Sequence, residues 1–76
     1  MDRGSEVVVV AYRGVALPRR VWEVAGKGVL VCSEEEYRRA LRLGEEPRAV
    51  GFPKWDVFLA DDPKAREAMA KPQSHA

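Results

Sequence analysis

Four consecutive valines, Val7–Val10, constrain the fold of this chain more than any other feature. Each valine loses side-chain freedom in a helix, whereas a pleated strand accommodates branched side chains well. A continuous apolar run also indicates a strand that is covered on both faces. We therefore expect a strand over 7–12 that ends before Arg13-Gly14, with Pro18 in the short loop that follows.

A β-hairpin is predicted next. Residues 19–24 alternate in polarity, and the alternation places Trp22 and Val24 on one face. Gly26-Lys27-Gly28 forms a tight turn, because glycine adopts a positive φ at little cost. Residues 29–32 are then the returning strand.

A helix over about 33–43 has complete start and stop signals. Ser33 is a good N-cap, and Glu36 completes a capping box. Glu34 and Arg38 are spaced as a favourable i,i+4 ion pair. Gly44 is the expected end of the helix. The stripe expected to be buried consists of Tyr37, Ala40 and Leu41.

Two short strands and a second helix are expected in the last third. The strands cover 48–52 and 54–59, and the helix covers about 63–71, with Pro63 in its first turn. The inner face of this helix is expected to be Ala65, Ala68 and Met69. We expect one domain over 6–71, with flexible termini at 1–5 and 72–76.

This order of elements predicts a small α+β fold of about five strands. It resembles an SH3-like barrel that carries a helix between its third and fourth strands, and the resemblance covers about residues 6–60. The sheet is expected to be antiparallel and either strongly bent or closed into such a barrel, and an open antiparallel sheet with the helix across one face is the alternative.

A second resemblance concerns the strand and capped helix from Val29 to Tyr37, with Ala40-Leu41 and Gly44 after them. The pattern resembles small phage-encoded accessory proteins. It implies a protein that binds something large, such as the host RNA polymerase, and it assigns no functional residue.

Composition narrows the functional classes. Thirteen basic residues against 12 acidic ones give a formal charge of +1, which argues against a dedicated non-specific nucleic-acid binder. One cysteine excludes an internal disulfide and favours a cytoplasmic location. We expect no membrane segment. The absence of Ile, Asn and Thr, together with abundant charge, also fits a thermophilic host.

The sequence contains no set of residues that is typical of a catalytic site. Gly26-Lys27-Gly28 joins two strands, whereas a phosphate-binding loop joins a strand to a helix. His75 and Cys32 do not make a ligand set for a metal, and the position of Cys32 before the helix predicts a buried thiol. We therefore expect no enzymatic activity, no cofactor and no metal.

The leading prediction is a binding module that docks on a larger protein as a regulator, adaptor or inhibitor. Arginines beside exposed aromatic rings are typical of protein-binding surfaces. The predicted contact residues are Arg19, Arg20, Arg48, Trp55 and Phe58. One alternative is nucleic-acid binding through the same arginines with Tyr12 or Trp22. Another is a homo-oligomer, or a homodimer in place of a monomer, that pairs through the strand at 7–12.

Overall fold

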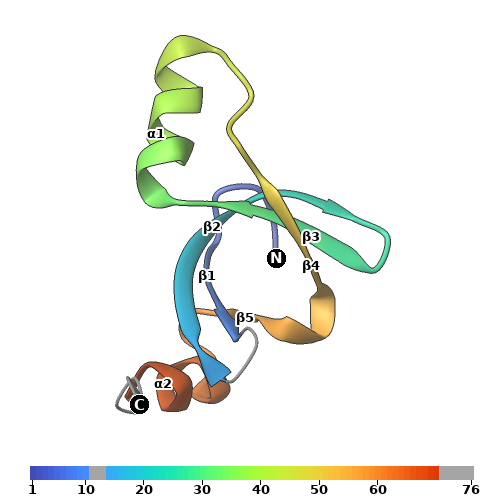
Figure 1. The fold of residues 1–76 in the computed structure, drawn as a ribbon, viewed down its shortest axis with the longest axis vertical. Coiled ribbons are helices and arrows are strands. Elements are labelled where there is room, and N and C mark those ends of the chain that lie inside the picture. The colour runs from blue at the N-terminus through green and yellow to red at the C-terminus, as the bar shows by residue number, and fades with distance from the viewer. Residues whose placement is uncertain (11–13, 71–76) are drawn as a thin grey trace.

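The computed structural model describes residues 1–10 and 14–70, and it is an α+β domain built on one antiparallel sheet (Figure 1). Tyr12, Lys71 and the tail at 72–76 lie outside the described residues, so the predictions made for them are not addressed. The elements in chain order are β1 (Glu6–Val10), β2 (Ala16–Ala25), β3 (Gly28–Cys32), α1 (Glu34–Leu43), β4 (Val50–Pro53), the 3-10 turn η2 (Lys54–Asp56), β5 (Val57–Leu59) and α2 (Pro63–Ala70).

The sheet has five strands in the order β4-β3-β2-β1-β5, and every neighbouring pair is antiparallel. The ten-residue β2 is long enough to serve two partners. Its first half pairs with β1 and its second half with β3, so the sheet bends strongly around it (Figure 1). The expected fold class and the two helices are confirmed.

One face of the sheet carries the main core. Paired residues in neighbouring strands point to the same face, which gathers branched side chains from four strands. Its buried members are Val7, Val9, Val21, Val29, Val31 and Val57, with Leu17 and Phe52 packed against them.

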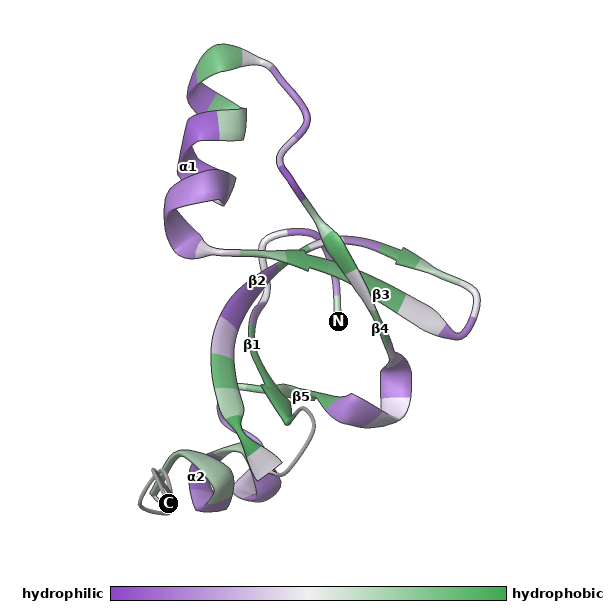
Figure 2. Ribbon diagram, in the orientation of Figure 1, coloured by the Kyte–Doolittle hydropathy of each residue, from purple (hydrophilic) through white to green (hydrophobic). Residues whose placement is uncertain are grey.

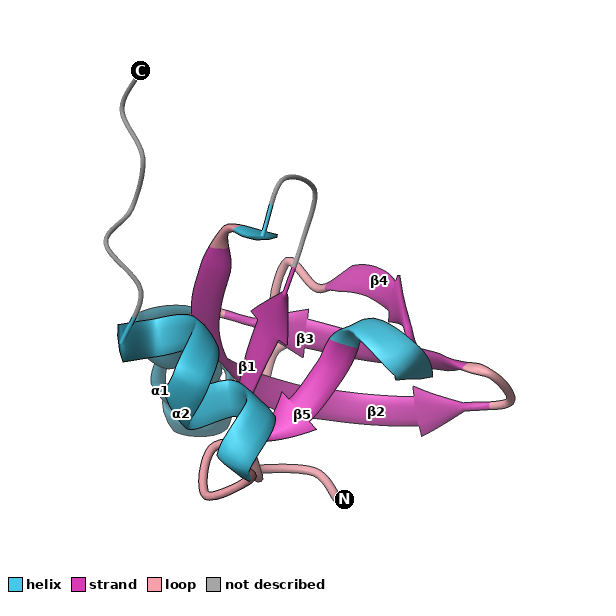
Figure 3. Cartoon of the chain, turned by 90° about the horizontal axis from the view of Figure 1, so that it is seen from below, coloured by secondary structure: helices cyan, strands magenta, loops and turns pink. Residues whose placement is uncertain are grey.

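The opposite face of β1 is covered by α2. Val8 and Ala16 pack there against Ala65 and Ala68, and Phe58 contacts the same cluster. Figure 3 shows α2 lying across this side of the sheet, and Figure 2 shows that β1 is hydrophobic along most of its length. The valine run is therefore covered on both faces, as its composition predicts. Met69, expected on the inner face of α2, is instead 48% exposed.

The predicted caps of α1 are confirmed. The Ser33 side chain accepts a hydrogen bond from the Glu36 N–H at 3.1 Å. Gly44 ends the helix in the left-handed conformation, with φ at 67° and its N–H bonded to the Ala40 carbonyl. The prediction that Leu41 is buried is wrong: it is 58% exposed, because α1 projects away from the sheet and only its first turns pack on β2 (Figure 1).

The strand pattern differs from the prediction around β2. A bulge between Val21 and Glu23 shifts the register, so Val24 shares the face of Val21 and not that of Trp22. Pro18 lies inside β2, opposite Val8, and not in a loop. Only one side of β2 is paired at this point, because the pairing with β3 begins at Arg20, so the missing N–H of Pro18 costs no bond on that open side.

The segment at 1–5, expected as a flexible terminus, is bonded to β2. The Gly4 N–H donates to the Val21 carbonyl at 2.8 Å, and the Val21 N–H donates to the Ser5 carbonyl at 3.0 Å. The Arg3 side chain donates to the Trp22 carbonyl at 2.7 Å. These bonds extend the antiparallel pairing of β1 with β2 to residues that precede Glu6, the first residue of β1.

Candidate functional site: an arginine-rimmed groove

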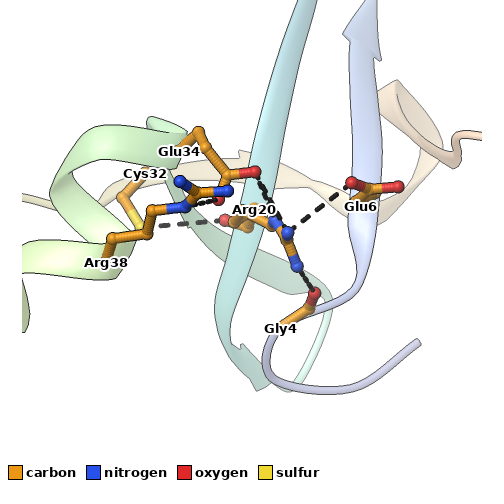
Figure 4. Close-up of polar contacts among 6 residues, drawn as sticks. All are labelled: Gly4, Glu6, Arg20, Cys32, Glu34 and Arg38. Atoms are coloured by element: carbon orange, nitrogen blue, oxygen red, sulfur yellow. Dashed lines mark hydrogen bonds and ion pairs between the residues drawn. The ribbon is translucent and has the colours of Figure 1, made fainter. Parts of the chain in front are cut away.

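Arg20, predicted as a partner contact, is engaged inside the domain (Figure 4). Its Nε and Nη2 donate to the same oxygen of Glu34 at 3.1 and 3.0 Å, and its Nη1 donates to the Gly4 carbonyl at 2.6 Å. Glu6 adds an ion pair at 3.5 Å. The hydrogen bond to Glu34 raises the pKa of the Arg20 guanidinium further, so it remains charged. Arg20 therefore joins the N-terminal segment, β2 and the start of α1.

An aromatic and cationic stack continues this junction. Arg20 lies 5.4 Å from the centre of the Tyr37 ring, and Tyr37 meets Trp22 edge to face at 6.1 Å. Arg3 covers Trp22 at 4.3 Å. Trp22, offered above as a base-stacking residue, is thus half-buried between an arginine and a tyrosine. The predicted ion pair from Arg38 to Glu34 is also present, at 3.5 Å.

Arg19 and Arg48, the other two predicted arginines, meet at one groove of about 250 Å³. Arg19 reaches it from β2, because alternation along the strand sends its side chain to the face opposite Arg20. Arg48 comes from the segment between α1 and β4. The other lining residues are Leu17, Val31, Cys32, Ser33, Glu36, Val50 and Phe52.

The lining of the groove is apolar between its charged residues. Val31 is buried, Phe52 is half-buried, and Val50 is 58% exposed on the edge strand β4. These residues carried no functional signal in the sequence. Strand alternation places Val50 and Phe52 on one face of β4, but their position opposite Leu17 depends on how strongly the sheet bends.

The two guanidiniums at the groove are not neutralised. Arg19 donates to the carbonyl of Pro18 at 2.8 Å, and no ion pair with a carboxylate is present for Arg19 or Arg48 within residues 1–10 and 14–70. Glu36 is the one carboxylate among the lining residues. The groove thus combines apolar side chains with unpaired positive charge.

Cys32 lines this groove but is poorly suited to nucleophilic chemistry. It is 3% exposed, and burial raises the pKa of its thiol, with a further rise from Glu36 and an opposing effect of Arg19. A raised pKa keeps the thiol protonated near neutral pH, and the thiolate is the reactive form. The predicted burial of Cys32 is confirmed.

The two predicted aromatic contacts differ in exposure. Trp55 is in η2, directly after β4, and is 68% exposed. The last strand is shorter than predicted because 54–56 forms this 3-10 turn. Phe58 faces the second core beside α2, with the Lys64 ammonium 5.7 Å from its ring. Trp55 is therefore available to a partner, whereas Phe58 contributes mainly to packing.

Comparison with known proteins gives no relative. No protein-family model, no curated protein and no solved structure matches the chain. Among the described residues, no helix is both long and apolar enough to span a membrane. The same residues contain no group of three or more His, Cys, Asp and Glu side chains placed to hold a metal ion.

Proposed function

We propose that the chain is a non-enzymatic binding module that docks on a larger protein through the groove between Arg19 and Arg48. One observation carries the proposal: two arginines far apart in sequence lie at the same apolar groove, and neither has a carboxylate partner among the described residues. Arg20, by contrast, stabilises the fold and is neutralised by Glu6 and Glu34. Unneutralised arginines beside apolar surface supply the charge and the contact area that protein interfaces use.

The groove favours a particular kind of ligand. Its volume of about 250 Å³ accommodates one large apolar side chain of a partner. A carboxylate next to that side chain would form charge-assisted hydrogen bonds with Arg19 or Arg48. The apolar contact supplies affinity, and the ion pairs select for acidic partners.

The expected resemblance to SH3-like barrels supports a binding role. The last strand, β5, returns to pair with the first, β1, which is compatible with a bent sheet approaching a barrel. The resemblance of the strand and capped helix to small phage-encoded accessory proteins is also consistent with a protein that binds a larger protein. Nucleic-acid binding is the less favoured function, because Trp22 is packed within the domain and the net charge is only +1.

The proposal is tested by capturing partners with the tagged protein from a lysate of the source cells, with and without nuclease. The test variant is Arg19→Glu/Arg48→Glu, and the control is Arg66→Glu, which reverses an exposed charge on α2. We expect nuclease-resistant capture of one dominant protein, retained by the control and reduced about tenfold or more by the double variant. Circular dichroism verifies that all variants fold.

Two results contradict the proposal. Equal capture by wild type and Arg19→Glu/Arg48→Glu would remove the groove from the interface. Capture that collapses after nuclease, and that weakens steeply as salt rises, would assign the arginines to phosphate contacts instead.

A further inference from the structure

We propose that the docking partner presents an extended acidic segment, which adds as a strand to the free edge of β4. This inference rests on the proposed function and specifies how the partner binds. The sheet ends at β4, and no described strand pairs with its outer side. The edge lies next to the groove, because Val50 and Phe52 belong to both.

The backbone of β4 has one residue suited to receive a strand. The Lys54 N–H donates to the Lys27 carbonyl at 2.8 Å, in register with the pairing of β3 and β4. In an antiparallel ladder, bonded and non-bonded pairs alternate, so Val50 and Phe52 face β3 and the residue between them, Gly51, faces outward. Gly51 has no side chain to shield its N–H and carbonyl.

Pro53 removes one donor from the free edge of β4 but none from the pairing with β3. By the same alternation, its backbone nitrogen points outward, as that of Gly51 does. The absence of an N–H at Pro53 therefore removes no hydrogen bond to β3. It also limits the site to the bonding groups around Gly51. Strand addition therefore contributes a small number of backbone bonds, and side-chain contacts must supply the rest.

The two cations that flank β4 favour an acidic segment. Arg48 precedes the strand and Lys54 follows it, and the nearest carboxylates along the chain, Glu46 and Asp56, lie outside these two cations. The opposite edge of the sheet differs, because β5 has acidic residues on both sides and no basic residue between them. A basic strand would be repelled from β4, whereas carboxylates at both ends of an acidic strand face opposite charges.

Exposed apolar side chains complete the site. Val50 is 58% exposed and Trp55 is 68% exposed, at the start and beyond the end of β4. Every second side chain of an added strand points to the groove side of the sheet. An acidic segment with alternating apolar residues can therefore place one side chain in the groove, beside Val50.

The test uses a synthetic peptide of alternating glutamate and valine, about eight residues long, which at roughly 3.3 Å per residue spans β4 and both flanking cations. The matched control peptide carries lysine in place of glutamate. Binding to the isotope-labelled full-length protein is followed by NMR. We expect the glutamate peptide to shift resonances of residues 48–55 and to slow hydrogen exchange of the Gly51 amide. Arg48→Glu/Lys54→Glu should weaken this binding about tenfold or more, and Arg66→Glu should not.

Three outcomes overturn the inference. Equal binding of the lysine peptide would exclude charge selection. Shifts at Arg19 and Val50 without protection of Gly51 would restrict binding to the groove, which contradicts strand addition and leaves the proposed function intact. Light scattering that shows self-association, abolished by Arg48→Glu/Lys54→Glu, would mean that a second copy covers the edge. Failure of the proposed function itself is seen separately, in capture that is insensitive to Arg19→Glu/Arg48→Glu.

Discussion

Two neighbouring arginines, Arg19 and Arg20, have opposite roles because they lie in a strand. Successive side chains of a strand point to opposite faces, so one guanidinium reaches the groove and the other reaches Glu34. The pair could be recognised as basic from the sequence. Which of the two arginines is neutralised depends on where α1 begins relative to β2. This position is set by tertiary packing and not by the local sequence.

Gly4 is the residue at which a single added carbon should cost most. Its φ is 91°, and a Cβ there would lie 2.6 Å from the Tyr37 hydroxyl oxygen. We expect Gly4→Ala to lower the free energy of unfolding by about 2–3 kcal/mol, measured by urea denaturation.

Gly26→Ala is the matched control for that change. Gly26 also has a positive φ, 58°, but a Cβ there meets nothing within 4 Å. It should therefore show the backbone penalty alone, about 1 kcal/mol. Equal losses for the two variants would mean that Tyr37 moves aside without cost.

The buried thiol of Cys32 should lower the free energy of unfolding at alkaline pH. Burial raises the pKa of its thiol above the ordinary value of 9.0, so the folded state holds this proton more tightly than the unfolded state. The resulting stability is complete below the ordinary pKa and is lost as the pH rises through the folded pKa. Urea denaturation between pH 7 and about 10 should show this loss, and Cys32→Ala should remove it. An identical pH profile for both proteins would contradict the assignment.

At the scale of elements, local chemistry was predicted well and packing was not. The caps of α1 depend on residues within one turn of each other, and Ser33 and Gly44 act as their types suggest. The exposure of Leu41 depends on α1 projecting from the sheet, which no local pattern records. The bulge after Val21 and the 3-10 turn at 54–56 likewise break a periodicity that continues smoothly in the sequence.

The N-cap of α1 can be tested directly. Ser33→Ala removes the acceptor of the Glu36 N–H, so we expect a loss of about 1 kcal/mol in the free energy of unfolding. Ser33→Asp supplies another acceptor at the same place and should retain most of the stability. Chemical denaturation followed by circular dichroism measures both, and a neutral Ser33→Ala variant would show that water replaces the cap.

At the scale of the whole molecule, the order of elements predicted the sheet but not the site. Short links along the chain bring β1, β2 and β3 together as a meander, and the sequence signals for these links are strong. The groove instead requires Arg19 and Val50 to meet across the bend of the sheet, which depends on how β2 is divided between two partners. Trp55 and Arg48 were identified by residue type, while their relation to one edge strand required the structure.

The place of β1 in the sheet has a consequence for how the protein is made. β1 is translated before its neighbour β5 and its cover α2, which belong to the last part of the described chain. Until those segments leave the ribosome, the valines of β1 have one free edge and one bare face. Such stretches readily pair with other unfolded chains. We therefore expect the yield at high rates of synthesis to depend on how soon β5 and α2 follow the valine strand out of the exit tunnel.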